Sequence, residues 1–199
     1  MTRAWGAAAL VFAPRSLLVG NAAAHAERDA LEHLVHVFEN VFRGDAHHAD
    51  ADRLEALVAA RGERFVVTLL DCPPSLGPVT VNALVAADRV IVPVQAEYLA
   101  LEGLVQFLDT VKLLRGELNP TLVLSGLLIT MTDERTRLSA DVERELRTHF
   151  PELVFQTVIP RSVRVAEAPS YGTPLLEHAP GSPGSDAYVE LTREVVERG

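Results

Sequence analysis

The sequence predicts an α/β protein whose mostly parallel sheet is covered by helices on both faces. Apolar runs of strand length recur with few polar residues in them, which is typical of strands buried on both faces. Segments with a helical spacing of apolar residues separate these runs, and such alternation implies parallel strands joined by right-handed crossovers. The expected strands cover residues 8–13, 65–70, 90–94, 122–130 and 153–159.

The intervening segments have the pattern of amphipathic helices. Residues 101–114 keep their apolar side chains on one face of a 3.6-residue period. Residues 138–150 do the same, and Ser139 is the N-cap that this pattern suggests. A shorter last helix runs from Tyr188 to Gly199. The remaining expectations are helices at 24–43 and 50–61, and a flexible loop at 179–185.

Composition narrows the class of protein. The chain has 199 residues, 48% of them hydrophobic and 23% charged, which suits one soluble globular domain with a real core. Cys72 is the only cysteine, so no disulfide framework exists, and no apolar run is long enough to span a membrane. The apolar N-terminal run is interrupted by Pro14 and Arg15, which disfavours a signal peptide. The net charge of -9 argues against a broad electropositive surface for nucleic acid.

Polar and unusual residues gather where the expected strands end. Asp71 follows the run at 65–70, Gln95 follows the run at 90–94, and Met131 follows the run at 122–130. In an open α/β sheet, ligands bind outside the carboxyl ends of the strands. A carboxylate at the tip of a buried strand suits a magnesium ion beside a phosphate, although capping of the following turn is an equally ordinary role for Asp71.

Other notable residues have simpler interpretations. His33 and His36 lie one helical turn apart, and His47 and His48 precede two aspartates, but this spacing fits no established metal site. We expect these histidines to be solvated and Cys72 to be a small buried residue. Asp133 and Arg135 are expected either to form a surface pair or to serve a ligand.

Seven segments with recognisable motifs follow one another along the chain. They are Asp71 to Gly77, Asn82 to Asp88, Pro93 to Gly103, Leu128 to Thr136, Val158 to Arg164, Glu167 to Gly172, and Ala187 with Tyr188. In this order they closely resemble the ParA/Soj family of partitioning ATPases, relatives of MinD. The resemblance covers about residues 65 to 190, within a single domain of residues 1–199, whereas residues 1–64 are divergent and match only faintly.

This resemblance implies a P-loop NTPase-like fold that binds ATP and magnesium, forms a homodimer around the nucleotides and binds DNA non-specifically. It also implies a ParB-like centromere-binding partner and a cytoplasmic, nucleoid-associated location without membrane attachment. Asp71 matches the aspartate that orients magnesium through water, and the DNA contacts would come from Arg135, Arg137 and Arg164. The nucleotide-binding residues by resemblance are Asp71, Pro73, Gln95, Met131, Pro160, Arg161 and Ser162.

The phosphate-binding loop of this family has no counterpart in the sequence. That loop is glycine-rich and has the form K-G-G-x-G-K-S/T, and it directs backbone N–H groups and lysine ammonium groups toward the phosphates. Lys112 is the only lysine and follows no such loop, so the family fold is expected to be N-terminally incomplete here. We therefore predict a partitioning protein that does not hydrolyse ATP by itself. A non-catalytic pseudo-ATPase that retains the dimer or partner surface stays open as the alternative.

Overall fold

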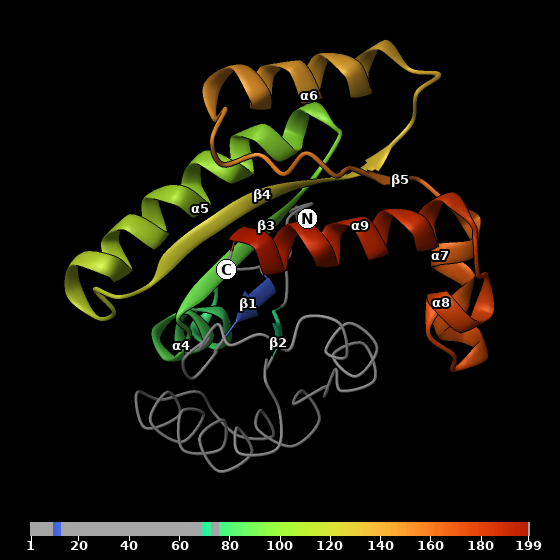
Figure 1. The fold of residues 1–199 in the computed structure, drawn as a ribbon. Helices are drawn as coiled ribbons and strands as arrows, with labels where there is room; N and C mark the ends of the chain where they lie inside the picture. The colour runs from blue at the N-terminus through green and yellow to red at the C-terminus, as the bar shows by residue number, and fades with distance from the viewer. Residues whose placement is uncertain (1–9, 13–68, 73–75, 199) are drawn as a thin grey trace. The chain divides into compact units, whose positions relative to one another are not determined.

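The computed structural model describes residues 10–12, 69–72 and 76–198. The expected helices at 24–43 and 50–61, the four histidines between residues 33 and 48, and Pro73 lie outside these residues. The strands are β1 Leu10–Phe12, β2 Leu69–Asp71, β3 Arg89–Gln95, β4 Val123–Thr132 and β5 Ile159–Pro160. The helices are α4 Pro78–Ala86, α5 Tyr98–Glu117, α6 Arg137–His149, α7 Val163–Glu167, η1 Ala168–Tyr171, α8 Leu175–His178 and α9 Pro183–Arg198 (Figure 1).

The sheet has five strands in the order β2-β1-β3-β4-β5. β4 and β5 are parallel, as expected. β1 runs antiparallel to both of its neighbours, with Val11 opposite Leu70 on one side and Val90 on the other. β2 and β3 therefore run in the same direction with one short reversed strand between them. The expected strand at 8–13 is confirmed at its centre, but its direction is not that of a parallel sheet.

The chain divides into two compact units. The first contains β1, β2, α4, the start of β3 and Val105–Leu124. Its helix α4 begins at Pro78, because proline presets the backbone angle of a first helical residue and has no N–H that the helix would leave unpaired. The end of α4 is held by Asn119, whose side-chain amide donates to the carbonyl oxygens of Leu84, Val85 and Ala87.

The second unit contains Val92–Leu104 and the chain from Ser125 onwards. Its core includes Leu127 and Ile129 of β4 together with Leu146 of α6 and Phe155, all fully buried or nearly so. Figure 1 shows β4 and β5 between α6 in orange and α9 in red. Helix α6 begins after Thr136, whose hydroxyl accepts the backbone N–H of Ser139. The prediction of Ser139 as the N-cap was therefore wrong, by three residues.

The expected strand at 153–159 is the largest departure from the sequence pattern. Only Ile159–Pro160 forms β5, and a single bridge joins Val154 to Leu127 of β4. Between Val154 and Ile159, charged side chains form hydrogen bonds with the backbone groups. Arg147 donates to the carbonyl oxygens of Phe155 and Gln156, and Glu194 accepts the N–H groups of Gln156 and Thr157. These bonds take the place of hydrogen bonds to a neighbouring strand, because they already satisfy the backbone N–H and C=O groups.

The C-terminal helix is longer than the sequence pattern suggested. α9 begins at Pro183, so the second half of the expected flexible loop at 179–185 is its first turn. Proline is favoured at such a start. Gly184 allows α9 to approach α7, because a Cβ there would lie 2.7 Å from Cγ2 of Val165. Among the described residues, no helix is long and apolar enough to cross a membrane.

Candidate functional site

The carboxyl ends of β3, β4 and β5 meet at one edge of the second unit. The backbone N–H of Ala96, just after β3, donates to the carbonyl oxygen of Thr130 at 2.9 Å. The backbone N–H of Arg161, just after β5, donates to the carbonyl oxygen of Thr132 at 2.9 Å. These three strand ends thus share one edge, which carries Gln95, Met131, Pro160, Arg161 and Ser162.

Met131 forms a β-bulge at this edge. It is the only non-glycine residue with a positive φ among those described, at 55°, and the pairing register of β4 with β5 shifts across it. Carbonyl groups two residues apart normally face the same neighbouring strand, since strand geometry repeats every two residues. Here the carbonyls of Thr130 and Thr132 serve opposite neighbours. A bulge of this kind re-aims a side chain at a strand end and is common beside binding sites.

The side chains around the bulge are apolar or uncharged and partly exposed. Met131 is 44% exposed, and Pro160, which pairs with Thr132 in the register of β5, is half-buried. The hydroxyl of Thr132 donates to the carbonyl oxygen of Ile159, which fixes the start of the following loop. Ser162 has an extended backbone before α7, and its side chain makes no capping bond to that helix. A polar group of a ligand can therefore use the Ser162 hydroxyl.

The charged residues of this edge are already engaged with one another. Arg161 donates to the carboxylate of Glu97 at 3.0 Å. Both oxygens of Asp133 accept from the Arg135 side chain, at 3.0 and 2.9 Å. The hydrogen bonds from Arg135, more than the charge of Arg161, hold the pKa of Asp133 near 2. The surface pair expected between Asp133 and Arg135 is confirmed.

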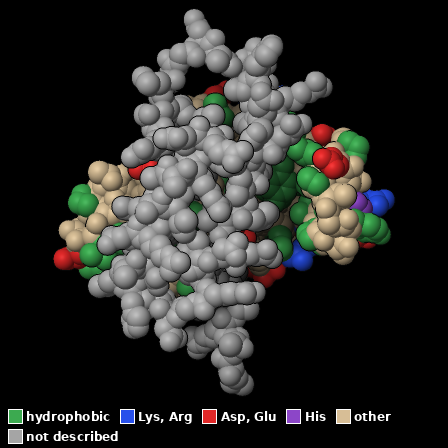
Figure 2. Space-filling view, turned by 90° about the horizontal axis from the view of Figure 1, so that it is seen from below, with side chains coloured by type: hydrophobic (Ala, Val, Ile, Leu, Met, Phe, Trp, Pro, Cys, Tyr) green, Lys and Arg blue, Asp and Glu red, His purple; other side chains and the backbone are tan. Residues whose placement is uncertain are grey.

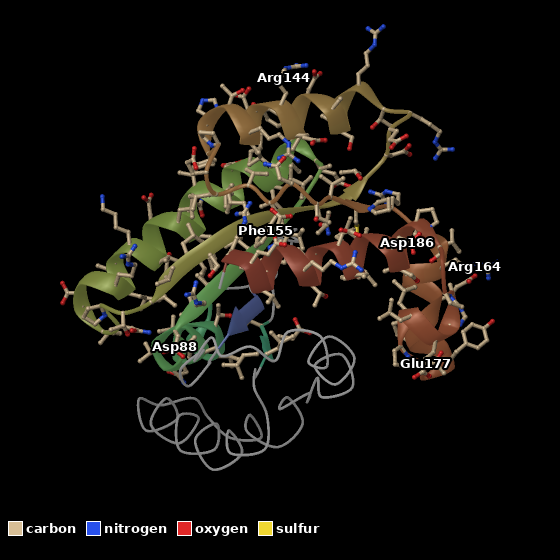
Figure 3. The ribbon with its side chains drawn as sticks, in the orientation of Figure 1. Asp88, Arg144, Phe155, Arg164, Glu177 and Asp186 are labelled. Atoms are coloured by element: carbon tan, nitrogen blue, oxygen red, sulfur yellow. The ribbon has the colours of Figure 1, made fainter. Side chains whose placement is uncertain are left out.

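Two further arginines were candidates for phosphate contacts. Arg164 lies 3.7 Å from the carboxylate of Glu167, on the short helix at the right of Figure 3. Arg137 makes no ion pair within the described part of the chain. At the right of Figure 2, hydrophobic, uncharged and acidic side chains gather, and basic groups lie at the margin. The arginines of this unit are thus mostly balanced locally by carboxylates.

Asp71 belongs to the first unit, where it is the last residue of β2 and its side chain is exposed. No ion pair of Asp71 is present within the described residues. Cys72 follows it and is buried, with Sγ 3.7 Å from the carbonyl oxygen of Leu70. Burial, and then the charge of Asp71, raise the pKa of the Cys72 thiol to about 12. The expectation that Cys72 is a small buried residue is confirmed, and its raised pKa keeps the thiol neutral.

No group of three metal-ligating side chains occurs within the described ranges, so Asp71 would hold magnesium only together with water or phosphate oxygens. Asp71 lies in the first unit and Met131 in the second. Lys112 is the only lysine of the sequence, and it lies in α5.

Comparison with known proteins identifies the relatives of this chain. A family model described as an AAA domain matches residues 35–124, so it begins upstream of the motifs at Asp71. The chain is 56% identical over 140 residues to the chromosome-partitioning ATPase Soj of Thermus thermophilus, a match that covers 70% of this chain and 56% of that protein. The chain is a Soj/ParA homologue.

Further relatives agree with this assignment. The homologue is 46% identical to the sporulation initiation inhibitor protein Soj of Bacillus subtilis, over 74% of the chain and 58% of that protein. It is 50% identical to the chromosome partitioning protein ParA of Caulobacter vibrioides, over 74% of the chain and 54% of that protein. The chain thus spans little more than half the length of the curated relatives it matches.

Solved structures support the α/β fold. A Mycobacterium smegmatis cobyrinic acid a,c-diamide synthase, with bound ATP analogue and magnesium, has a TM-score of 0.61 and 35% identity, covering 76% of this chain and 55% of that one. The cell division ATPase MinD of Pyrococcus furiosus has a TM-score of 0.60 and 21% identity, covering 76% of this chain and 60% of that one. The second likeness concerns the fold alone.

Proposed function

We propose that this Soj/ParA homologue takes part in the partitioning of chromosomal or plasmid DNA and binds a magnesium nucleotide without hydrolysing ATP by itself. The observation that carries the nucleotide proposal is the left-handed bulge at Met131, flanked on both sides by loops tied to β4. The bulge lies at the carboxyl edge of an α/β sheet, which is where such sheets bind ligands. Relatives named chromosome-partitioning ATPases support the biological role.

Each residue of the proposed site has a defined part. Met131 and Pro160 would contact the faces and edge of an adenine ring, and the Ser162 hydroxyl would bind a polar atom of the nucleotide. Gln95, at the end of β3, would present its amide to the same ligand. In the first unit, and by the family resemblance alone, Asp71 would hold the water shell of a magnesium ion. The resemblance also proposes Pro73, which lies outside the described residues, as a nucleotide contact.

The proposal of weak binding without turnover follows from the phosphate contacts. Phosphoryl transfer depends on positioning and electrostatic stabilisation of the phosphates. Each charge-assisted hydrogen bond to such a group is worth roughly 1.5–3 kcal/mol. Lys112 is the only lysine of the 199 residues and lies in α5, while Arg161 is paired with Glu97. These residues cannot replace a full cradle for a triphosphate.

A second candidate is a non-catalytic binding module that keeps a protein-binding surface. Tyr98 and Leu99 at the start of α5 are 73% and 77% exposed, which is unusual for large apolar side chains beside a buried strand end. A second copy of this chain or a ParB-like centromere-binding protein would cover them. We propose a cytoplasmic, nucleoid-associated location for either candidate. DNA contact would rest on Arg137, because Arg135 and Arg164 are near carboxylates.

Calorimetry and a phosphate-release assay test this function. The full chain is titrated with ADP and with ATP, each with and without magnesium. We expect weak, magnesium-dependent binding, a loss of the magnesium dependence in Asp71→Ala, and no change in Asp109→Ala, an exposed carboxylate of α5. We expect no phosphate release above the uncatalysed rate. Magnesium-dependent turnover that Asp71→Ala abolishes would overturn the proposal of inactivity, and the absence of any nucleotide binding would favour the second candidate.

A further inference from the structure

One side-chain contact joins the two loops that flank Met131. Nη2 of Arg161, after β5, donates to Oε1 of Glu97, after β3, at 3.0 Å. The two residues are 64 positions apart in sequence, and each side chain is about half exposed. Together with the bonds from Ala96 and Arg161 to β4, this ion pair completes a closed ring of contacts around the bulge.

The ring gives the Arg161 side chain a defined orientation. Its backbone N–H is bound to Thr132, its guanidinium is bound to Glu97, and its charge reaches Asp133 on the loop after β4. The guanidinium is therefore bound to one carboxylate, that of Glu97, and is near enough to Asp133 to influence its charge. A guanidinium compensated in this way serves to hold the loops in place, and it is a poor partner for a phosphate group.

The structure assigns to Glu97 the role of a positioning residue for the proposed nucleotide site. Glu97 acts through Arg161, and its carboxylate keeps the loop at 160–162 in the orientation that receives the base. Without Glu97, the loop after Arg161 is held to β4 only upstream, by the Arg161 N–H bonded to Thr132 and by the pairing of Pro160 with Thr132, among the contacts of the described residues. The loop would then become ordered only when the nucleotide binds, and the entropy lost in ordering it would weaken nucleotide binding. This inference rests on the proposed function of the site.

The test begins with the protein free of nucleotide. Hydrogen exchange at the Arg161 amide reports the bond to Thr132 directly, so it measures loop order without any ligand. We expect Glu97→Gln and Arg161→Gln each to speed this exchange about two- to five-fold, the range that an exposed ion pair produces. Glu117→Gln, an exposed carboxylate at the end of α5, is the matched control and should leave the rate unchanged. An unchanged rate in Glu97→Gln would overturn the inference.

The second arm measures the dissociation constant of magnesium ADP by calorimetry. We expect both single variants to weaken binding about two- to five-fold, and the double variant to be no weaker than either. The reversed pair, Glu97→Arg with Arg161→Glu, should recover part of the affinity, which a merely structural defect would not allow. Additive losses would overturn the inference. If the unaltered chain binds no ADP, the proposed function fails, whereas the exchange measurement still decides the role of Glu97.

Discussion

The side-chain amide nitrogen of Asn119 lies 2.7 Å from the carbonyl oxygen of Ala87, the residue that ends α4. The same nitrogen is 3.0 Å from the carbonyl oxygens of Leu84 and Val85. Asn119 is buried, and its own carbonyl oxygen accepts the hydroxyl of Thr121. The last carbonyls of a helix have no partner within it, so this one side chain completes the C-terminus of α4 from 32 residues away.

Replacing Asn119 by Ala should lower the free energy of unfolding by about 2–4 kcal/mol, because several buried carbonyl groups lose their donor. Thr121→Val removes only the hydroxyl that orients Asn119, so we expect a loss of about 0.5–1.5 kcal/mol. Urea titrations of the full chain, followed by circular dichroism, measure both values. Equal losses in the two variants would show that the contact with Thr121, and not the cap, carries the effect.

Gly126 in β4 should not tolerate a side chain. A Cβ at this position would lie 2.5 Å from Cε2 of Phe155 and 2.8 Å from the carbonyl oxygen of Leu153. Phe155 is fully buried, between α6 and α9 in Figure 3, so the ring has little room to move. We expect Gly126→Ala to cost about 1–3 kcal/mol of stability. Gly116 lies in a helix, and a Cβ there would have nothing within 4 Å. We therefore expect Gly116→Ala to leave stability unchanged or to raise it by up to about 1 kcal/mol. Thermal unfolding of both variants measures these changes.

The backbone of Met131 should discriminate sharply between substitutions. Its φ of 55° is a left-handed conformation that β-branched residues rarely adopt and glycine adopts freely. Met131→Val should destabilise the chain by about 1–3 kcal/mol, whereas Met131→Gly should leave stability unchanged or raise it slightly. Chemical denaturation of both variants tests this. If valine were tolerated as well as glycine, the bulge would not have the left-handed geometry.

The Glu194 carboxylate should make stability depend on pH. Burial alone would raise its pKa, but hydrogen bonds from Thr157 and Gln156, together with the charge of Arg198, outweigh burial and lower the pKa below its ordinary 4.5. A group whose pKa is lower in the folded state stabilises that state above its unfolded pKa, and this gain disappears as the pH falls through the folded pKa.

Glu194→Gln should therefore cost about 1–3 kcal/mol at pH 7 and progressively less below pH 4.5. Urea midpoints at pH 7 and pH 3.5, at matched ionic strength, give the comparison. Glu190→Gln is the control, because the Glu190 side chain is exposed and, within the described part of the chain, pairs with Arg193 of the same helix. It should change stability by less than about 0.5 kcal/mol at either pH. A cost for Glu194→Gln that is independent of pH would contradict the assigned role of its charge.

Much of the fold could be predicted from local patterns. Apolar runs predicted β3 and β4, and the 3.6-residue period predicted α5 and α6, because the burial of one face leaves a periodic trace in the sequence. The ordered motifs from Asp71 to Tyr188 predicted the relationship to Soj and ParA, which the comparisons bear out. The surface pair of Asp133 and Arg135 was also within reach, since two residues that close in sequence meet in most loop conformations.

The tertiary structure alone decided the details that depend on distant partners. The apolar run at 153–159 has the pattern of a strand, but Arg147 and Glu194 occupy its backbone groups and leave only Ile159–Pro160 in the sheet. The ring of contacts around Met131 also depends on distant partners, because its ion pair joins Glu97 to Arg161, 64 residues later. Periodicity reveals which side of an element is buried. It carries no information about which remote side chain will bind a given backbone group, and that choice is made only when the chain has folded.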